Sequence, residues 1–279
     1  MRVILSRKGF DSAAGGRPNL ILSDGTMVPF PIPACSERDT FGECYAPMPH
    51  NAKTFHSLLL EHGQEIVCNG KKVRLDEDTP CHLDPDICFE SKPRSAGWRG
   101  CFGQAGVAQT VLHKNRVGPG DLFLFFGWFN GEKRDERFYR VGGWHSLYGY
   151  LQVDAVIRPF LDEVPTWAED HPHAKLERRD ERRNCIYIAK KTASWDSTIP
   201  GFGLFRYDKE LDLTKEGMSR SRWELPECFR GLSIAYHNEQ SWKDDYFQSA
   251  YRGQEFVIEE NKQVARWAMC LVSSYARKC

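Results

Sequence analysis

A histidine and two aspartates occupy every second position of the segment His82-Leu83-Asp84-Pro85-Asp86. Alternate side chains of an extended chain project to the same side, so His82, Asp84 and Asp86 are expected to face a common space. An imidazole beside two carboxylates can bind a divalent metal, or can act as a general acid and base if the pKa values of the groups differ. The competing interpretation is a polar turn, because Asp-Pro-Asp is typical of turns and helix caps.

The pair His82-x-Asp84 also occurs in iron oxygenases, which need a second, distant histidine to complete the set of ligands. Three later histidines are available for that role, namely His145, His171 and His173. The last two flank a proline in a charged stretch, a setting that favours exposure to solvent. The pattern therefore leaves the distal ligand open.

A second group of polar residues lies in the N-terminal loop that follows the first apolar run. Arg7 and Lys8 could hold a phosphate, and Asp11 could act in proton transfer. Gly15 and Gly16 could let backbone amides approach an anion. The spacing matches neither the P-loop nor the dinucleotide fingerprint, and a flexible surface loop is the competing interpretation.

Clusters of aromatic and basic residues could contact nucleic acid. A flat ring beside a guanidinium group can stack on a base while the cation holds its phosphate. Arginine beside tryptophan is also common on surfaces where the ring packs inward. Basic and acidic residues both number 38, so any contact with nucleic acid must come from a local patch. The two strongest candidate patches are Arg220, Arg222 and Trp223, and Arg94, Trp98 and Arg99.

Two further polar positions are Gln104 and Cys101. Gln104 stands at the predicted start of a helix and could hydrogen-bond the edge of a base. Cys101 has no candidate base near it in the sequence, so we expect a structural thiol. The ten cysteines include no Cys-x-x-Cys pair, which disfavours a zinc knuckle and indicates free thiols in a reducing compartment.

The elements that must position these side chains are short strands and a few helices. The run 122–126 is apolar at every position, which predicts a central strand buried on both faces. Apolar residues at three-four spacing predict a C-terminal helix at about 262–276. The other expected strands are 2–5, 149–157, 185–189 and a hairpin around Asp24-Gly25, and the other expected helices are 51–62, capped by Asn51, and 104–115.

These elements predict an α+β fold with a curved, mostly antiparallel sheet or partial barrel and helices packed outside it. Gly120-Asp121 before an apolar strand, followed by the segment 150–153, resembles the barrel core of PUA-like domains. With 41% hydrophobic and 13% aromatic residues, the chain can bury a sizeable core, and we expect residues 1–279 to form a single domain. No apolar run approaches the roughly 20 residues of a membrane span, and we expect a cytoplasmic protein.

Several of these segments occur in an order that resembles the nucleotide modification associated domain 3 family. The likeness covers about residues 2–230 and continues into the terminal helix. It implies a setting in bacterial and phage systems that modify the bases of nucleic acid, without implying a reaction. The segments that carry it are Ser6 to Asp11 with Gly15-Gly16, Ser23-Asp24-Gly25 leading to Pro31-Ile32-Pro33, His82 to Asp86, Phe102 to Gly106, Gly120 to Gly127, Tyr150 to Val153 and Arg220 to Pro226.

The leading hypothesis is an enzyme that modifies a nucleotide or a nucleic-acid base, with its site formed by the 6–16 loop and the 82–86 segment. In this hypothesis His82, Asp84 and Asp86 are acids, bases or ligands of a divalent metal. The first alternative is a PUA-like module that binds a modified base without chemistry. The second is a metal-dependent oxygenase that uses His82 and Asp84 and does not act on nucleic acid.

Overall fold

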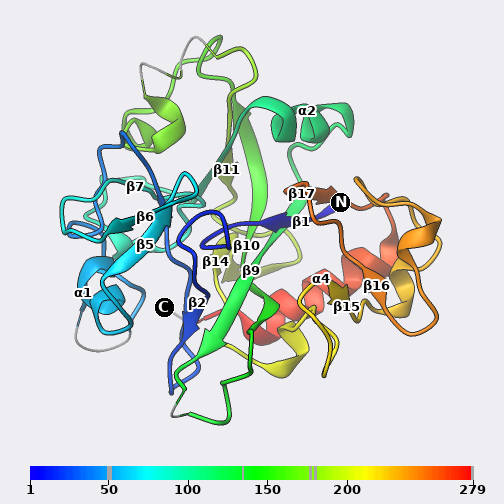
Figure 1. The fold of residues 1–279 in the computed structure, drawn as a ribbon. Helices are drawn as coiled ribbons and strands as arrows, with labels where there is room; N and C mark the ends of the chain where they lie inside the picture. Colours follow the sequence, from blue (N-terminus) through cyan, green and yellow to red (C-terminus); the bar gives the residue numbers. More distant parts are fainter. Residues whose placement is uncertain (49–51, 134, 176–177, 179–180, 278–279) are drawn as a thin grey trace.

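A strongly curved sheet forms the centre of the computed structural model, which describes all residues except 49–51, 134, 176–177, 179–180 and 278–279 (Figure 1). Two long antiparallel neighbours, β9 (Leu122–Gly131) and β10 (Trp144–Ile157), run through its middle. The other strands of this sheet are β1 (Val3–Arg7), β2 (Asn19–Ile21), β3 (Met27–Val28), β8 (Cys101–Gln104), β11 (Cys185–Ala189), β14 (Phe202–Leu204) and β17 (Glu255–Val257).

The order of the main path is β17-β1-β9-β10-β11-β8, with β14 paired to β10 and the hairpin β2-β3 paired to β9. These pairings are antiparallel except those of β9 with β1 and with β2. The sheet curls into a half-barrel with helices outside it, which confirms the predicted α+β class. The predicted hairpin and the strand at 185–189 are present, and the strand predicted at 149–157 is the second part of β10.

Strands β1 and β2 pair with β9 one after the other, both in parallel. The first pairing ends at Arg7 opposite Phe126, and the second begins at Asn19 opposite Phe129. The loop between the two strands therefore leaves the sheet and returns to the same neighbouring strand. The side chain of Asn19 stabilises this return, because its Oδ1 accepts the backbone N–H of Phe10 at 3.1 Å and its Nδ2 donates to the carbonyl of Trp128 at 2.8 Å.

The run 122–126 is a central strand segment with no exposed side chain, as its unbroken apolar sequence predicts. On one face, the ring of Phe123 lies 4.9 Å from that of Phe102. On the other face, the ring of Phe126 lies 5.0 Å from that of Trp223. Both faces of the strand are therefore covered by aromatic side chains.

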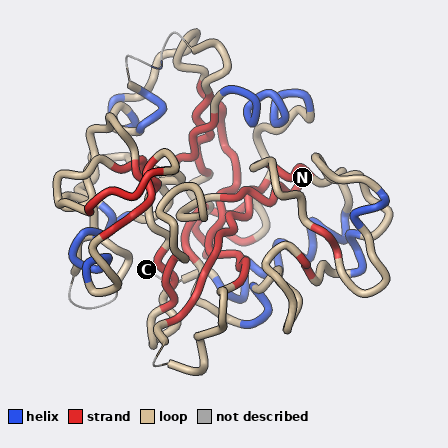
Figure 2. Tube along the Cα trace, in the orientation of Figure 1, coloured by secondary structure: helices blue, strands red, loops and turns tan. Residues whose placement is uncertain are grey.

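The helices lie outside the curved sheet (Figure 2). The C-terminal helix α4 (Lys262–Tyr275) is confirmed and begins at the cap Asn261, whose side chain accepts the N–H groups of Gln263 and Val264. Helix α2 (Gly106–Lys114) starts later than predicted, because Gln104 is the last residue of strand β8. Helix α1 (Phe55–Leu60) is capped by Thr54, and the predicted cap Asn51 lies outside the described residues.

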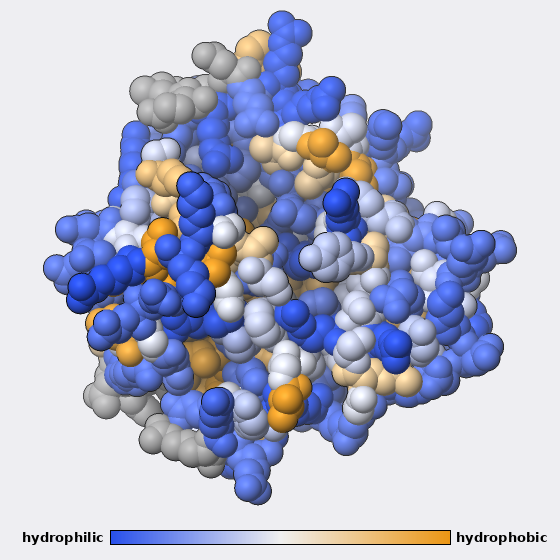
Figure 3. All heavy atoms as spheres, viewed as in Figure 1, coloured by the Kyte–Doolittle hydropathy of each residue, from blue (hydrophilic) through white to orange (hydrophobic). Residues whose placement is uncertain are grey.

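Smaller elements surround the sheet. Within the described part of the chain, no helix combines the length and the apolar character needed to cross a bilayer. On the face shown in Figure 3, hydrophobic residues form small separate groups among hydrophilic ones. The small strands are β4 (Ile32–Pro33), β5 (Glu65–Cys68), β6 (Lys71–Arg74), β7 (Cys81–His82), β12 (Thr192–Ala193), β13 (Asp196–Pro200), β15 (Arg222–Trp223) and β16 (Phe247–Gln248). The short 3-10 helices are η1 (Phe89–Ser91), η2 (Thr166–Ala168), η3 (Pro172–Ala174), η4 (Lys209–Leu211), η5 (Glu227–Phe229) and η6 (Glu239–Ser241).

The segment that follows β7 docks on the end strand of the main path, β8. Asp86 and Cys101 exchange two backbone hydrogen bonds of 2.8 Å each. This docking carries the 82–86 segment to the edge of the sheet, next to the 3-10 helix η3, which β8 and β11 also contact.

Candidate metal centre and adjoining pocket

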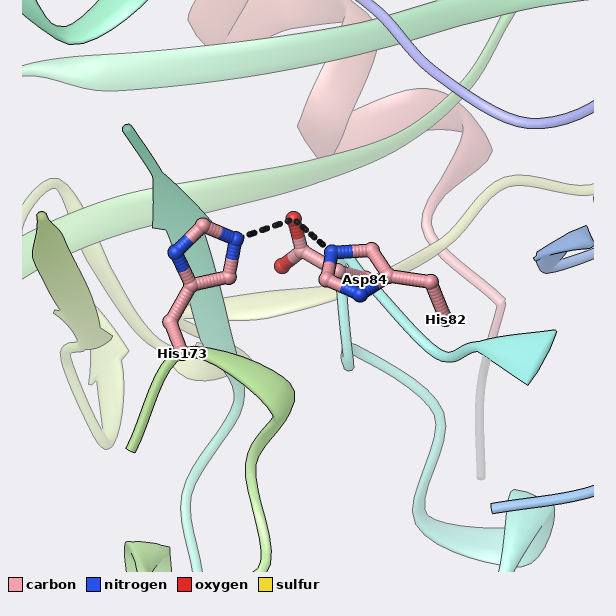
Figure 4. A group of neighbouring side chains, drawn as sticks. All are labelled: His82, Asp84 and His173. Carbon is pink, nitrogen blue, oxygen red and sulfur yellow. Dashed lines mark ion pairs between the residues drawn. The ribbon is translucent and has the colours of Figure 1, made fainter. Parts of the chain in front are cut away.

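Three potential metal ligands converge where β7, β8 and η3 meet: His82, Asp84 and His173 (Figure 4). Asp84 Oδ2 lies 3.9 Å from His82 Nε2 and 4.0 Å from His173 Nε2. Two ligands bound to one metal at about 2.1 Å each are about 3.4 Å apart in a tetrahedral site and at most about 4.2 Å apart, so these side chains would have to move closer together to share an ion. All three ligand atoms lie within 4.8 Å of one another.

The ring of His82 is oriented by Glu37, which lies in the loop after β4. His82 Nδ1 is 3.0 Å from Glu37 Oε1. Burial raises the pKa of Glu37, but its hydrogen bonds with His82 and Lys175 outweigh this effect and lower the pKa to about 2. Because an ionised carboxylate can only accept, Nδ1 of His82 carries a proton and Nε2 is the nitrogen that faces Asp84.

The ring of His173 is oriented by the buried amide of Asn184. Nδ2 of Asn184 donates to the carbonyls of His173 and Arg178 at 2.8 and 3.2 Å, so the amide oxygen must face the ring. That oxygen lies 2.6 Å from His173 Nδ1, which therefore donates and leaves Nε2 unprotonated. Burial lowers the pKa of His173 to about 3, which keeps the ring neutral.

Asp84 is buried and offers one free oxygen to the centre. Its Oδ1 accepts the backbone N–H of Gly103 at 2.7 Å, and His171 Nε2 lies 3.3 Å from the same oxygen without forming a hydrogen bond. Burial raises the pKa of Asp84, but the surrounding imidazoles outweigh this effect and lower it below the ordinary value. A glycine is required at 103, because a Cβ there would lie 2.2 Å from the ring of His173.

Asp86 does not join this group, which corrects the predicted ligand set. Its carboxylate forms a two-pronged ion pair with Arg94, with one contact of 2.7 Å. Both side chains are buried, and the ring of Trp98 lies 4.0 Å from the guanidinium of Arg94. The pair anchors the docked segment, and His173 is the third residue of the group with His82 and Asp84 instead.

The histidines at 171 and 173 also correct an expectation, since both are buried and not exposed to solvent. The two side chains flank Pro172 at the start of η3, and the backbone N–H of His173 donates to His171 Nδ1 at 3.2 Å. Contact of η3 with strands β8 and β11 explains their burial. His145, the other predicted candidate for a distal ligand, lies in a different cavity.

A cavity of about 400 Å³ opens onto the three ligands. The predicted site residues Asp11, His82 and Asp84 all line it, so the 6–16 loop and the 82–86 segment do meet in one cleft. Asp86 is the exception to that prediction. The other residues lining this cavity are Arg7, Lys8, Gly9, Ile32, Gly103, Gln104, Ala105, His173, Arg178, Arg252, Gly253 and Gln254.

Two predicted ligand-binding side chains, Lys8 and Gln104, are already occupied by protein partners. Lys8 forms a buried ion pair of 2.8 Å with Glu255, so its charge is not free for a phosphate. Gln104 Nε2 donates to the same oxygen of Glu255 at 2.6 Å, and Gln104 Oε1 accepts the N–H of Ala105. The pair of side chains forms a buried network at the cavity wall, so Lys8 is not free for its predicted phosphate contact, nor Gln104 for its predicted contact with a base.

The glycines of the N-terminal loop also have structural roles. The N–H of Gly15 donates to the carbonyl of Val67, and that of Gly16 donates to the carbonyl of Asp11. Their positive φ angles allow the chain to turn back over the ring of Phe10. The amides are therefore not available to an anion, which corrects their predicted role.

The aromatic-basic patches are likewise revised. Trp223 is only 1% exposed and donates through Nε1 to His145 Nδ1 at 3.1 Å, so it cannot stack on a base. Arg222 is exposed and lies over the ring of Tyr246, where it lines neither the cavity of the metal centre nor the cavity that holds His145. In the second patch, Arg94 is bound to Asp86 and Arg99 to Asp154.

Sequence reasoning missed three residues that shape the site: Glu37, Asn184 and Glu255. None belongs to a recognisable motif, and each lies more than ten residues from its partner in the sequence. A weak signal existed for Asn184 only, as a polar residue directly before the predicted strand at 185–189. Their contribution depends on contacts that only the folded chain brings together.

The fold and the site together define a class: an α+β half-barrel with two histidines and one carboxylate converging at a cavity on the sheet edge. The family model described as nucleotide modification associated domain 3 matches residues 2–259. The chain belongs to this family. Comparisons with curated proteins and with solved structures give no match.

Proposed function

We propose that this protein is a metal-dependent enzyme that modifies a base in a nucleotide or in nucleic acid, with His82, Asp84 and His173 as the metal ligands. One observation carries the proposal: both imidazoles direct Nε2 toward the same carboxylate oxygen, Asp84 Oδ2. Glu37 and Asn184 hold those rings by their other nitrogen, as the outer partners of metal-binding histidines commonly do. Membership of the nucleotide modification family supports the class of substrate.

A divalent metal at this centre would supply Lewis acidity and an activated water, or, in the case of ferrous iron, a place for dioxygen chemistry. The protein residues around it would bind and orient the substrate. Asp11 lines the same cavity and is the candidate to hold or move a proton, since two backbone amides occupy only its Oδ1. Lys8 and Glu255 would shape the cavity wall as a neutral pair.

A second candidate function is a metal-dependent oxygenase. The combination of two histidines and one carboxylate with open positions is the ligand set of non-haem iron oxygenases. The sequence pattern His82-x-Asp84 with the distal His173 favours this interpretation of the metal centre. A catalytic zinc site can use a similar set, so the identity of the metal separates oxidative from hydrolytic chemistry.

Metal analysis of the purified protein tests the proposal. We expect about one tightly bound divalent ion per chain, and its loss in the variants Asp84→Asn and His173→Ala. His113→Ala, an exposed histidine on α2, is the matched control and should keep the metal. Mass spectrometry of nucleosides after incubation with DNA and with free nucleotides would then detect a modified base.

Two results would contradict the proposal. A protein that binds no divalent metal under reducing conditions has no metal centre, and a module that only binds modified bases would then be favoured. Metal retention by both ligand variants would show that the ion is bound elsewhere.

A further inference from the structure

A second cavity, of about 500 Å³, adjoins the metal-centre cavity. The two share Arg7, Lys8 and Asp11 in their linings, so the N-terminal loop forms the boundary between them. The second cavity is also lined by Arg220 and His145. The two cavities therefore lie on either side of this loop, with Arg7 at the wall of both.

Arg7 is the last residue of β1 and lines both cavities. Its hydrogen-bond acceptors are uncharged. Its two terminal nitrogens donate to the backbone carbonyls of Ala250 at 2.7 Å and Tyr251 at 3.0 Å. Its Nε is buried and has no hydrogen-bond partner. Since an arginine has five N–H donors, the Arg7 guanidinium keeps unused capacity.

Arg220 faces the same cavity from the loop before β15. Its guanidinium lies 3.8 Å from the ring centre of Trp128 and donates to Ser12 Oγ at 3.3 Å. The aromatic face and the hydroxyl fix the position of this guanidinium without neutralising it. Most of its donors therefore remain available.

Neither guanidinium forms an ion pair with a carboxylate among the residues that the structure describes. Burial lowers the pKa of both, the nearby Asp11 carboxylate opposes this only in part, and the positive charge of Arg220 also lowers the pKa of Arg7. Asp11 is the one acidic side chain in the described lining of the second cavity, and its Oδ1 is occupied by the N–H groups of Ala13 and Ala14. Two half-buried cations thus share a cavity in which an anion would relieve their repulsion.

We propose that Arg7 and Arg220 form a phosphate subsite that holds the 5′-phosphate of a nucleotide unit while its base reaches the metal centre. Planar guanidinium groups bind phosphate oxygens in pairs, and unsatisfied donors favour such binding. The inference rests on the proposed function for the chemistry at the base, but the binding of phosphate can be measured without it. A cavity of about 400 Å³ lies at the small end of the range for ligand pockets, which suits one nucleoside.

The phosphate could belong to a free nucleotide or to a strand. Both present the same group to Arg7 and Arg220, and binding experiments distinguish them. Calorimetry with the metal-reconstituted protein would use the four deoxynucleoside 5′-monophosphates, the matching nucleosides, and a short single-stranded DNA. We expect at least one nucleotide or the strand to bind about tenfold or more tightly than the nucleosides, as charge-assisted hydrogen bonds allow.

The decisive variant is Arg220→Gln, with Arg222→Gln as the matched control. Arg222 is two positions away, exposed, and lines neither cavity. We expect Arg220→Gln to weaken phosphate-bearing ligands about tenfold or more, while nucleoside affinity and metal content stay unchanged. Because Arg7 supports the sheet edge, Arg7→Lys is the second variant, with its folding checked by thermal unfolding.

Equal affinity for nucleotides and nucleosides would overturn the subsite, as would equal behaviour of the Arg220 and Arg222 variants. Absence of phosphate-dependent binding in both the free-nucleotide and the strand experiments would also overturn it. Loss of the metal in Asp84→Asn with retained phosphate-dependent binding would leave the subsite intact. The two proposals therefore fail in distinguishable ways.

Discussion

Asn184 Oδ1 lies 2.6 Å from His173 Nδ1, and this contact determines which nitrogen of the ring is free to bind a metal. The orientation of the amide is fixed in turn, because its nitrogen donates to two backbone carbonyls. Asn184 therefore fixes the proton position of a proposed metal ligand through the ring nitrogen that faces away from the centre.

Replacing Asn184 tests this preparation. In Asn184→Leu the proton on His173 is no longer fixed at Nδ1, and we expect metal affinity to fall about 10- to 100-fold. Asn184→Asp keeps an oxygen acceptor for Nδ1 but loses both donations to the carbonyls of His173 and Arg178, so we expect its affinity to lie between those of the Leu variant and the original protein. Competition with a chelator of known affinity measures both. Unaltered affinity in the Leu variant would contradict the role given to Asn184.

The two aspartates of the 82–86 segment should behave in opposite ways. Asp84→Asn should abolish metal binding, whereas Asp86→Asn should keep the metal and lower stability, because Arg94 is left buried without its partner. The loss of a buried pair costs about 3–5 kcal/mol of unfolding free energy. Metal content and urea unfolding, measured on both variants, check the contrast. If Asp86→Asn instead lost the metal and kept its stability, Asp86 would be a metal ligand and the prediction would be wrong.

The contrast between Asp84 and Asp86 shows which parts of the candidate site could be predicted from the sequence. The alternation of polar residues predicts that His82 and Asp84 face a common space, and both line one cavity, because this placement depends only on local geometry. Asp86 was misassigned because its partner, Arg94, is chosen by docking of the segment on β8. His173, which its charged local sequence indicates to be exposed, is buried because η3 contacts β8 and β11.

His145 should make the protein sensitive to acid. Burial first, and then the positive charges of Arg7 and Arg220, lower its pKa from 6.5 to about 3. The folded pKa is below the unfolded value, so the neutral ring contributes stability above pH 6.5 that is lost as the pH falls toward 3. The loss approaches about 1.4 kcal/mol per pH unit at most, and less here because part of the residue remains accessible to solvent.

Urea unfolding between pH 7 and pH 4 measures this effect in the original protein and in His145→Gln. Glutamine can still accept the N–H of Trp223 but does not titrate. His173 also has a lowered pKa, so only the difference between the two proteins reports on His145. The same pH dependence of the unfolding free energy in both proteins would show that His145 does not contribute to it.

The central strand should tolerate no loss of volume. Phe125 is fully buried, with its ring 5.3 Å from that of Phe102, and Phe125→Ala should cost about 3–5 kcal/mol of unfolding free energy. Phe89→Ala is the matched control, because Phe89 is 60% exposed and should change stability little. Thermal unfolding compares them, and an unchanged midpoint in Phe125→Ala would show that this part of the core does not stabilise the fold.

A strand of the sheet could be predicted where its own sequence is distinctive. The pairing of strands that are far apart in the sequence could not be predicted. The apolar run of β9 identified a central strand directly, because every position is buried. The pairing of β1 with β17 had no such signal, since β17 is three residues long and lies at the far end of the chain. The sequence therefore did not identify Glu255 as the ion-pair partner of Lys8.

That distant pairing also has a consequence for synthesis of the chain. Lys8 and Glu255 are 247 residues apart, so the ribosome must release the chain as far as β17 before their ion pair and the β1-β17 ladder can form. Until then, β1 has an unpaired edge and Lys8 lacks its carboxylate, a state that favours aggregation and slow folding. The cavity wall formed by Lys8 and Glu255 can therefore assemble only after β17 has been synthesised.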